Sequence, residues 1–211
     1  MTVAVRWVVG VMLAALAGAA WGETTLAPPQ EFYFDNDPAA QVVEVVKGEG
    51  NDLVNQLMRQ RERGRKQLEA TVQLASVAIG QGRVELGESL YAEALKSGAL
   101  NSPQGRQVRW NYGWDLYRLG RYDAALEQWN LAADALRGNA AWAPPTYAVA
   151  LWQLGRRDEA VQWYAAAART EPAQWSGSDR FAALLPTWRE SERATLKEVQ
   201  QAWAANPPAW P

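Results

Sequence analysis

The stretch LYRLGRYDAALEQW, at residues 116–129, recurs in altered form as LWQLGRRDEAVQWY at residues 151–164, thirty-five residues further along the chain. In both copies a Gly separates two segments whose apolar residues are spaced by three and four. This spacing is typical of two amphipathic helices joined by a tight turn. Aligned on that Gly, the copies share Gly120 with Gly155, Ala125 with Ala160, Trp129 with Tyr164 and Ala132 with Ala167.

A degenerate copy precedes these two, thirty-eight residues before the middle one, with Gly82 at its turn and Gly87, Tyr91 and Ala94 in register. Small residues let two helices approach closely, and the aromatic residue between them fills the gap beside them. A single helical hairpin leaves an apolar flank bare, which a neighbouring hairpin covers. The recurrence therefore predicts an all-α fold of three stacked hairpins, at about residues 66–97, 105–137 and 141–170.

The pattern resembles the tetratricopeptide repeat, a helix-turn-helix unit of about 34 residues with small and aromatic positions at these spacings. The matching positions of the middle copy are Tyr112, Gly113, Leu116, Gly120, Tyr122, Ala125, Trp129 and Ala132. Those of the third copy are Tyr147, Ala148, Leu151, Gly155, Ala160, Tyr164, Ala167 and the closing Pro172. The resemblance covers about residues 68–175 and implies a helical solenoid.

The resemblance also implies that the first helix of each hairpin lines a concave groove for a peptide or helix of a partner. The corresponding positions are Trp110, Trp114, Tyr117 and Arg118 in the middle repeat, and Trp142, Val149, Trp152 and Gln153 in the third. Because Pro144 and Pro145 favour a helix start, Trp142 is open to a loop position instead. A second interpretation is that the N-terminal arm or the C-terminal helix fills the groove.

The composition bounds the chemistry of the chain. It has no Cys and no His, which excludes thiolate and imidazole groups as nucleophiles, proton carriers and metal ligands. The formal net charge of -2, with both signs mixed along the chain, gives no field for nucleic acid or an anionic membrane. No sequence motif places the candidate carboxylates opposite one another. These are Asp115, Glu127, Asp158 and Glu159. We expect no enzyme activity, cofactor or metal.

The first 22 residues have the layout of a secretory signal. Arg6 precedes an uncharged apolar run from Trp7 to Trp21, and small residues flank Trp21 before Glu23. We expect cleavage after about Gly22, a periplasmic or secreted protein, and no stable membrane insertion. No Cys follows the run, so no lipid anchor is expected. An extended, Pro-rich arm at residues 23–50 would follow, including the aromatic group 32–34.

The remaining segments are predicted from their patterns. Helical repeats are expected over residues 51–175, C-terminal capping helices over 176–205 and a frayed tail over 206–211. Phe181, Leu184 and Leu185 are expected to close the stack. A terminal helix is expected from about Pro186, with its apolar face formed by Trp188, Leu196, Val199 and Trp203.

These features predict a non-catalytic scaffold or adaptor of the bacterial cell envelope, which binds another envelope protein of unknown identity through an aromatic groove. The alternative is an envelope glycan-binding module, for peptidoglycan, because twelve Trp residues offer rings on which sugars stack.

Overall fold

The structure is a computed structural model, and it describes residues 23–29, 34–97 and 101–209. Within these residues there are ten α-helices, and none is long and apolar enough to cross a membrane. The predicted signal segment lies outside the described residues, as do the first two of the three aromatic residues at 32–34. The helices are α1 (Gly50–Arg63), α2 (Gln67–Gly80), α3 (Val84–Ser97), α4 (Pro103–Arg118), α5 (Tyr122–Asp134), α6 (Ala143–Gln153), α7 (Arg157–Thr170), α8 (Pro172–Trp175), α9 (Phe181–Leu184) and α10 (Glu190–Ala205).

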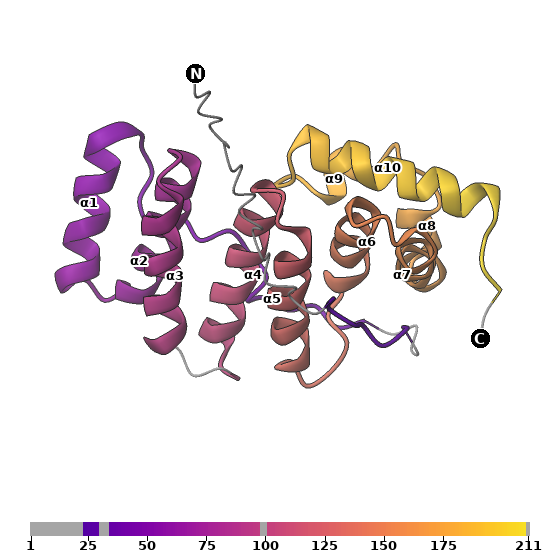
Figure 1. Cartoon of the computed structure of the whole chain (residues 1–211), viewed down its shortest axis with the longest axis horizontal. Helices are drawn as coiled ribbons and strands as arrows, with labels where there is room; N and C mark the ends of the chain where they lie inside the picture. Colours follow the sequence, from indigo (N-terminus) through magenta and orange to yellow (C-terminus); the bar gives the residue numbers. More distant parts are fainter. Residues whose placement is uncertain (1–22, 30–33, 98–100, 210–211) are drawn as a thin grey trace, which may run out of the picture.

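The helices α2 to α7 form three hairpins, α2–α3, α4–α5 and α6–α7, which stand side by side in a row (Figure 1). Helix α1 packs on α2 at one end of the row. Helix α10 lies across α6 and α7 at the other end, with its axis crosswise to theirs (Figure 1). The predicted all-α solenoid of stacked hairpins is confirmed. The face made by α2, α4 and α6, the first helix of each hairpin, is called the first-helix face below.

Each hairpin turns at a Gly in the left-handed region of the backbone. The φ angles are +78° at Gly82, +76° at Gly120 and +79° at Gly155, and side-chain-bearing residues rarely adopt such values. At the middle hairpin, Gly113 allows α4 to contact α5 closely, because a Cβ atom there would overlap the indole of Trp129. Trp129 is fully buried, and its Nε1 donates to the carbonyl oxygen of Trp110 at 3.2 Å.

The residues in register form the core of the stack. Those buried between helices are Gly87, Tyr91, Ala94, Gly113, Ala125, Trp129, Ala132, Ala148, Ala160, Tyr164 and Ala167. The turn glycines are exposed at the ends of the hairpins. Pro172 is exposed as well and takes the first position of α8. It therefore ends α7, where its missing N–H is harmless, and does not pack between repeats.

One predicted helix start is close and one is wrong by a few residues. Helix α6 begins at Ala143, two residues after the predicted start of its hairpin, because Pro144 and Pro145 fit a first helical turn. Trp142 therefore precedes the helix. Helix α10 begins at Glu190 and not near Pro186, since its N-terminus is set by a capping box in which the Glu192 carboxylate accepts from the backbone N–H of Arg189 at 2.6 Å.

Two segments outside the hairpins cover the first-helix face. Residues 35–46 of the N-terminal arm run along the row of helices from the side of α6 towards α2 (Figure 1), whereas Thr24 bonds Asp123 and Arg156 at the starts of α5 and α7. The segment between α9 and α10, together with α10, covers the ends of α4 and α6 nearest the hairpin turns. Both segments bring backbone and side chains against residues that the sequence assigned to a groove.

Candidate peptide-binding face

Two of the predicted groove tryptophans, Trp110 and Trp114, are buried under the chain's own C-terminal segment. Trp114 is 3% exposed, and its ring lies 4.6 Å from that of Trp188 and 5.0 Å from that of Trp129. Trp110 meets the edge of Trp114 at 6.1 Å. The interpretation in which the groove is filled therefore describes this structure. Packed against one another, these rings present no open stacking surface for a sugar in this conformation.

Polar contacts from α4 and α6 fix α10 in place. Nε of Arg118 donates to Oε1 of Glu192 at 2.9 Å, and Glu192 is 2% exposed. Gln153 donates to Thr195 at 3.1 Å. The indole of Trp152 donates to Glu198 at 2.8 Å, while the guanidinium of Arg157 lies 3.6 Å from its ring centre. The outer groove positions thus bind a helix, and that helix is α10.

The other two predicted groove residues lie deeper. Val149 is fully buried, and Tyr117 is 7% exposed with its ring at 5.8 Å from Trp114. Burial raises the pKa of Tyr117 to about 12, because the phenolate would lose its hydration. Val149, by contrast, is a core residue in this conformation.

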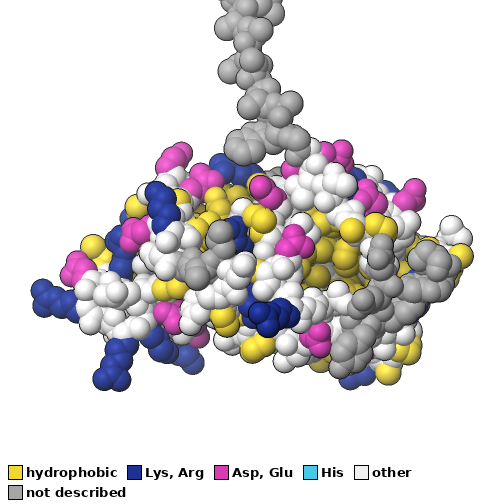
Figure 2. Space-filling view, turned by 90° about the horizontal axis from the view of Figure 1, so that it is seen from below, with side chains coloured by type: hydrophobic (Ala, Val, Ile, Leu, Met, Phe, Trp, Pro, Cys, Tyr) yellow, Lys and Arg dark blue, Asp and Glu magenta, His cyan; other side chains and the backbone are white. Residues whose placement is uncertain are grey.

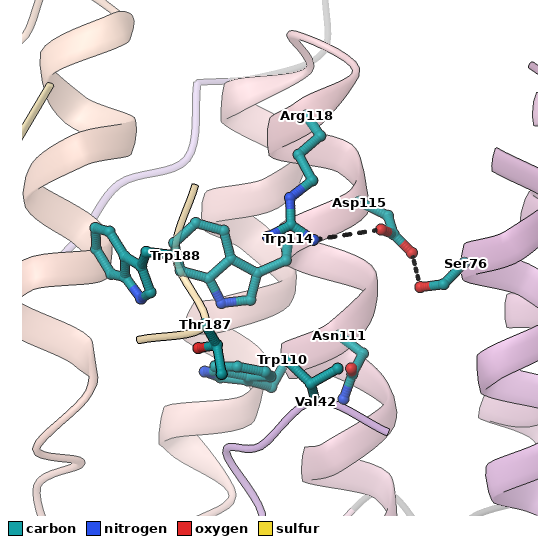
Figure 3. Close-up of a pocket in the computed structure, with 9 residues that line it drawn as sticks. All are labelled: Val42, Ser76, Trp110, Asn111, Trp114, Asp115, Arg118, Thr187 and Trp188. Atoms are coloured by element: carbon teal, nitrogen blue, oxygen red, sulfur yellow. Dashed lines mark hydrogen bonds and ion pairs between the residues drawn. The ribbon is translucent and has the colours of Figure 1, made fainter. Parts of the chain in front are cut away.

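A small cavity of about 40 Å³ remains between α4, the arm and the segment before α10 (Figure 3). That volume suits about one water molecule. Val42, Trp110, Trp114, Asp115 and Trp188 are among its lining residues. Within the described residues, Nε1 of Trp110 and of Trp114 are buried and have no hydrogen-bond acceptor.

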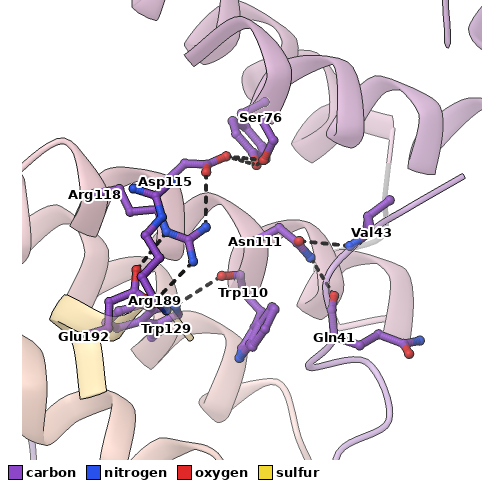
Figure 4. A network of polar contacts seen from close by, with 11 residues as sticks. Gln41, Val43, Ser76, Trp110, Asn111, Asp115, Arg118, Trp129, Arg189 and Glu192 are labelled. Carbon is purple, nitrogen blue, oxygen red and sulfur yellow. Dashed lines mark hydrogen bonds and ion pairs between the residues drawn. The ribbon is translucent and has the colours of Figure 1, made fainter. Parts of the chain in front are cut away.

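The arm is held through its backbone by Asn111 on α4 (Figure 4). Oδ1 of Asn111 accepts from the backbone N–H of Val43 at 3.1 Å, and Nδ2 donates to the carbonyl oxygen of Gln41 at 2.9 Å. Asn111 is 6% exposed and Val43 is 8% exposed. One amide therefore pairs with both a donor and an acceptor of an extended segment, as a neighbouring β-strand would.

Gln73 on α2 repeats this arrangement one hairpin earlier. Its Oε1 accepts from the backbone N–H groups of Val45 at 2.7 Å and Val46 at 3.0 Å, and its Nε2 donates to the carbonyl oxygen of Val46 at 2.6 Å. Gln73 stands nine residues before Gly82, and Asn111 stands nine residues before Gly120. The two amides thus occupy the same position in successive hairpins and bind successive parts of the arm.

The other end of the arm is fixed by charge and by backbone pairing. Arg106 on α4 donates from Nε and Nη2 to the two carboxylate oxygens of Asp37 at 3.2 and 3.1 Å. The Asp37 side chain is 1% exposed and that of Arg106 is 11% exposed, so this ion pair is removed from water. Trp142 donates to the same carboxylate at 3.4 Å. Asp35 forms an isolated parallel bridge with Ala140, next to the start of α6.

The sequence patterns do not predict the roles of Gln73, Arg106 and Asn111. Large aromatic residues on the first helices drew the prediction to Trp110 and Trp114. When the hairpins are aligned on their turn glycines, a polar amide recurs at one position, as Gln73 in the first hairpin and Asn111 in the second. This recurrence could have identified both residues from the sequence. The ion-pair partner Asp37 lies 69 residues from Arg106, and no local pattern connects the two.

A buried polar chain links four helices beside the arm (Figure 4). Ser76 of α2 and Tyr91 of α3 both bond to Oδ2 of Asp115 on α4, the latter at 2.6 Å. Arg118 lies 3.9 Å from Asp115 and bonds Glu192 of α10. Burial and then the nearby Asp115 carboxylate raise the pKa of Tyr91 well above its usual value. Ser76 and Tyr91 thus share one carboxylate oxygen, and these bonds connect α2 and α3 to α4.

Charged groups elsewhere are dispersed. On the face seen in Figure 2, Lys and Arg side chains gather at the end formed by α1, and acidic side chains are interspersed along the rest. Within the described part of the chain, no group of three or more Asp or Glu side chains is placed to hold a metal ion.

Comparison with known proteins bears on the repeat region alone. Residues 72–141 match the family model for the tetratricopeptide repeat. No curated protein and no solved structure matched the chain. The matched residues span the first two hairpins, and so include the copy that the sequence marked as degenerate; α6 and α7 add a third hairpin stacked on them. With its register of small and aromatic residues, its left-handed Gly turns and its stacked hairpins, the chain contains tetratricopeptide repeats, which the family model matches over residues 72–141.

Proposed function

We propose that the protein is a non-catalytic scaffold of the cell envelope that holds a segment of another protein on its first-helix face. Tetratricopeptide repeats commonly serve as surfaces for protein partners. The single observation that carries the proposal is the way in which Asn111 and Gln73 bond the backbone of an extended segment. Such contacts give affinity for a peptide main chain, while side-chain pockets supply specificity.

The binding surface in this proposal has two parts. The part around Gln73, Arg106 and Asn111 suits an extended segment. The part around Arg118, Trp152 and Gln153 suits a helix, because it holds α10 through Glu192, Thr195 and Glu198. Both parts are occupied by the chain itself in this conformation, so a partner has to compete with these segments or extend them.

Site-specific crosslinking tests the proposal in cells. A photoreactive residue is placed at Gln107, which lies one helical turn before Asn111 on α4, and as a control at Gln162, which is exposed on α7. We expect a discrete crosslinked protein from position 107 and none from position 162. Crosslinks from position 162 alone, or from neither position, would contradict a partner site on the first-helix face.

The envelope location is tested separately. Cell fractionation combined with N-terminal sequencing of the purified protein should recover a chain that begins at Glu23 outside the cytoplasm. A chain that retains residues 1–22, or that remains in the cytoplasm, would contradict this part of the proposal without affecting the binding surface.

A further inference from the structure

The arm shows which peptide chemistry the first-helix face recognises. Between Asp37 and Val46, the arm gives the face one buried carboxylate, two buried apolar side chains and a series of backbone groups. Arg106 binds the carboxylate with two nitrogen atoms, and Asn111 binds the backbone on both sides of Val42. The buried side chains between them are Ala39, at 6% exposed, and Val43, at 8% exposed.

We propose that the arm stands in for a segment of the partner, and that the face recognises a peptide that turns directly after an acidic residue and carries a β-branched residue six positions later. This inference rests on the proposed function. The acidic residue takes the place of Asp37 beside Arg106, and the β-branched residue takes the place of Val43 beside Asn111. The partner segment competes with the arm for the same contacts.

Charge complementarity sets the acidic position. The Arg106 side chain is 11% exposed and pairs with both oxygens of Asp37. Loss of the carboxylate leaves the guanidinium of Arg106 buried without a counter-charge, which strongly disfavours the bound state. A peptide that lacks the acidic residue therefore binds poorly, whatever its other contacts.

The backbone contacts set the conformation of the peptide. The arm turns after Asp37, whose carbonyl oxygen accepts from the backbone N–H of Ala40 at 3.0 Å, is extended beside Asn111, and bends at Val45 and Val46 beside Gln73. Asn111 and Gln73 bond N–H and C=O groups between Gln41 and Val46, and these bonds do not depend on side-chain identity. The side chains of Gln41, Val42 and Glu44 are exposed, with Val42 at 51%. The peptide is thus free to vary at these three positions, and specificity falls on the positions of Asp37, Ala39 and Val43.

The arm is attached so that it can leave the face. It joins α1 through Gly48, at φ +139°, and Gly50, at φ +63°, and neither glycine has another group within 4 Å of the position that a Cβ atom would take. Glycine at both positions permits large backbone rotations. Held by so short a link, the arm competes at an effective concentration of the order of millimolar, which masks the site in the intact chain.

Peptide binding to the full chain tests the inference. The probe is a fluorescently labelled synthetic peptide FDNDPAAQVVEVV, the sequence of residues 34–46. Asp37→Ala in the chain weakens the arm but leaves Arg106 and Asn111 in place. By fluorescence polarisation, we expect this variant to bind the probe at least about tenfold more tightly than the unaltered chain, since the competing arm is released.

Two matched controls assign the binding to the face. Adding Asn111→Ala to the Asp37→Ala chain should weaken probe binding at least about tenfold, and so should replacing Asp37 by Ala in the peptide. Circular dichroism establishes that each variant is folded. Val43→Lys, which loosens the arm without leaving Arg106 unpaired, provides a second released chain if Asp37→Ala does not fold.

Two results would overturn the inference. One is a released chain that does not bind the probe, or binds it equally well with Asn111→Ala. The other is an unaltered chain that forms a dimer by analytical ultracentrifugation and becomes monomeric with Val43→Lys, which would make a second copy of the chain the occupant. A partner crosslinked from position 107 would still support the scaffold proposal in either case, so the two claims fail separately.

Discussion

Gln73 and Asn111 stand at the same position of successive hairpins, nine residues before the turn glycines, and both side-chain amides bond the backbone of the arm. The repeat thus places two side-chain amides with the same role in a line, one on each of two stacked hairpins. A periodic scaffold is suited to an extended ligand because each hairpin presents the same position to the next part of that ligand.

Removing the amide of Asn111 should destabilise the folded chain. In Asn111→Ala, the backbone N–H of Val43 loses its acceptor in a buried setting, and we expect the free energy of unfolding to fall by about 1–3 kcal/mol. Urea denaturation measures the change. Asn130→Ala is the control, since Asn130 bonds Asp134 at an exposed site. Equal stability of the two variants would show that the arm contact contributes nothing.

Gly113 tests the close contact between α4 and α5. In Gly113→Ala, the new methyl group overlaps the indole of the fully buried Trp129, and we expect a loss of about 1–3 kcal/mol. Gly80→Ala on α2 provides the control, because nothing lies within 4 Å of its Cβ position and Ala favours a helix. Thermal melting should separate the two variants. A Gly113→Ala protein as stable as the unaltered chain would contradict the packing described.

Glu192 tests the attachment of α10. Its buried carboxylate binds Arg118 and caps the backbone N–H of Arg189, so Glu192→Ala should cost about 3 kcal/mol or more and expose the amides of α10 to hydrogen exchange. Glu190→Ala, at an exposed position of the same first turn, should have a small effect. If both variants exchange alike, the Arg118–Glu192 pair does not hold the helix.

Alkaline pH should weaken the fold through its buried tyrosines. The pKa of Tyr117 is raised to about 12 by burial, whereas an unfolded tyrosine titrates near 10. Between these values the unfolded chain loses a proton that the folded chain retains, so the free energy of unfolding falls as pH rises from about 10 to about 12. Denaturation across this range should show a shallower decline in Tyr117→Phe. An unchanged pH dependence would contradict the buried setting of this phenol.

The sequence predicted the hairpins well because the information is local. Apolar periodicity, the turn glycines and the positions of Ala125 and Ala160 recur within each repeat, and the helix that begins near Gln67 is found within a residue of its predicted start. The predicted start of α10 was wrong because a single contact sets it: the first turn is fixed by the Glu192 cap and not by Pro186.

Local sequence patterns could not show which segments of the chain cover the first-helix face. Asn111 bonds Val43 across 68 residues, and Arg118 bonds Glu192 across 74 residues. Amphipathic spacing says which side of α4 is apolar, but not which distant segment covers it. The aromatic residues Trp110 and Trp114 were consistent with both an open and a filled groove, and packing of Trp188 against Trp114 determines the outcome.

The central claim is that the first-helix face holds the backbone of the arm as it would hold a peptide. Native-state hydrogen exchange at the amides of Val43 and Val45 tests it most directly. Both should exchange at least about 100-fold more slowly than in the free peptide 34–46, and Asn111→Ala should remove the protection of Val43 while that of Ala160 in α7 persists. Exchange of Val43 in the unaltered chain at the rate of the free peptide would contradict the account.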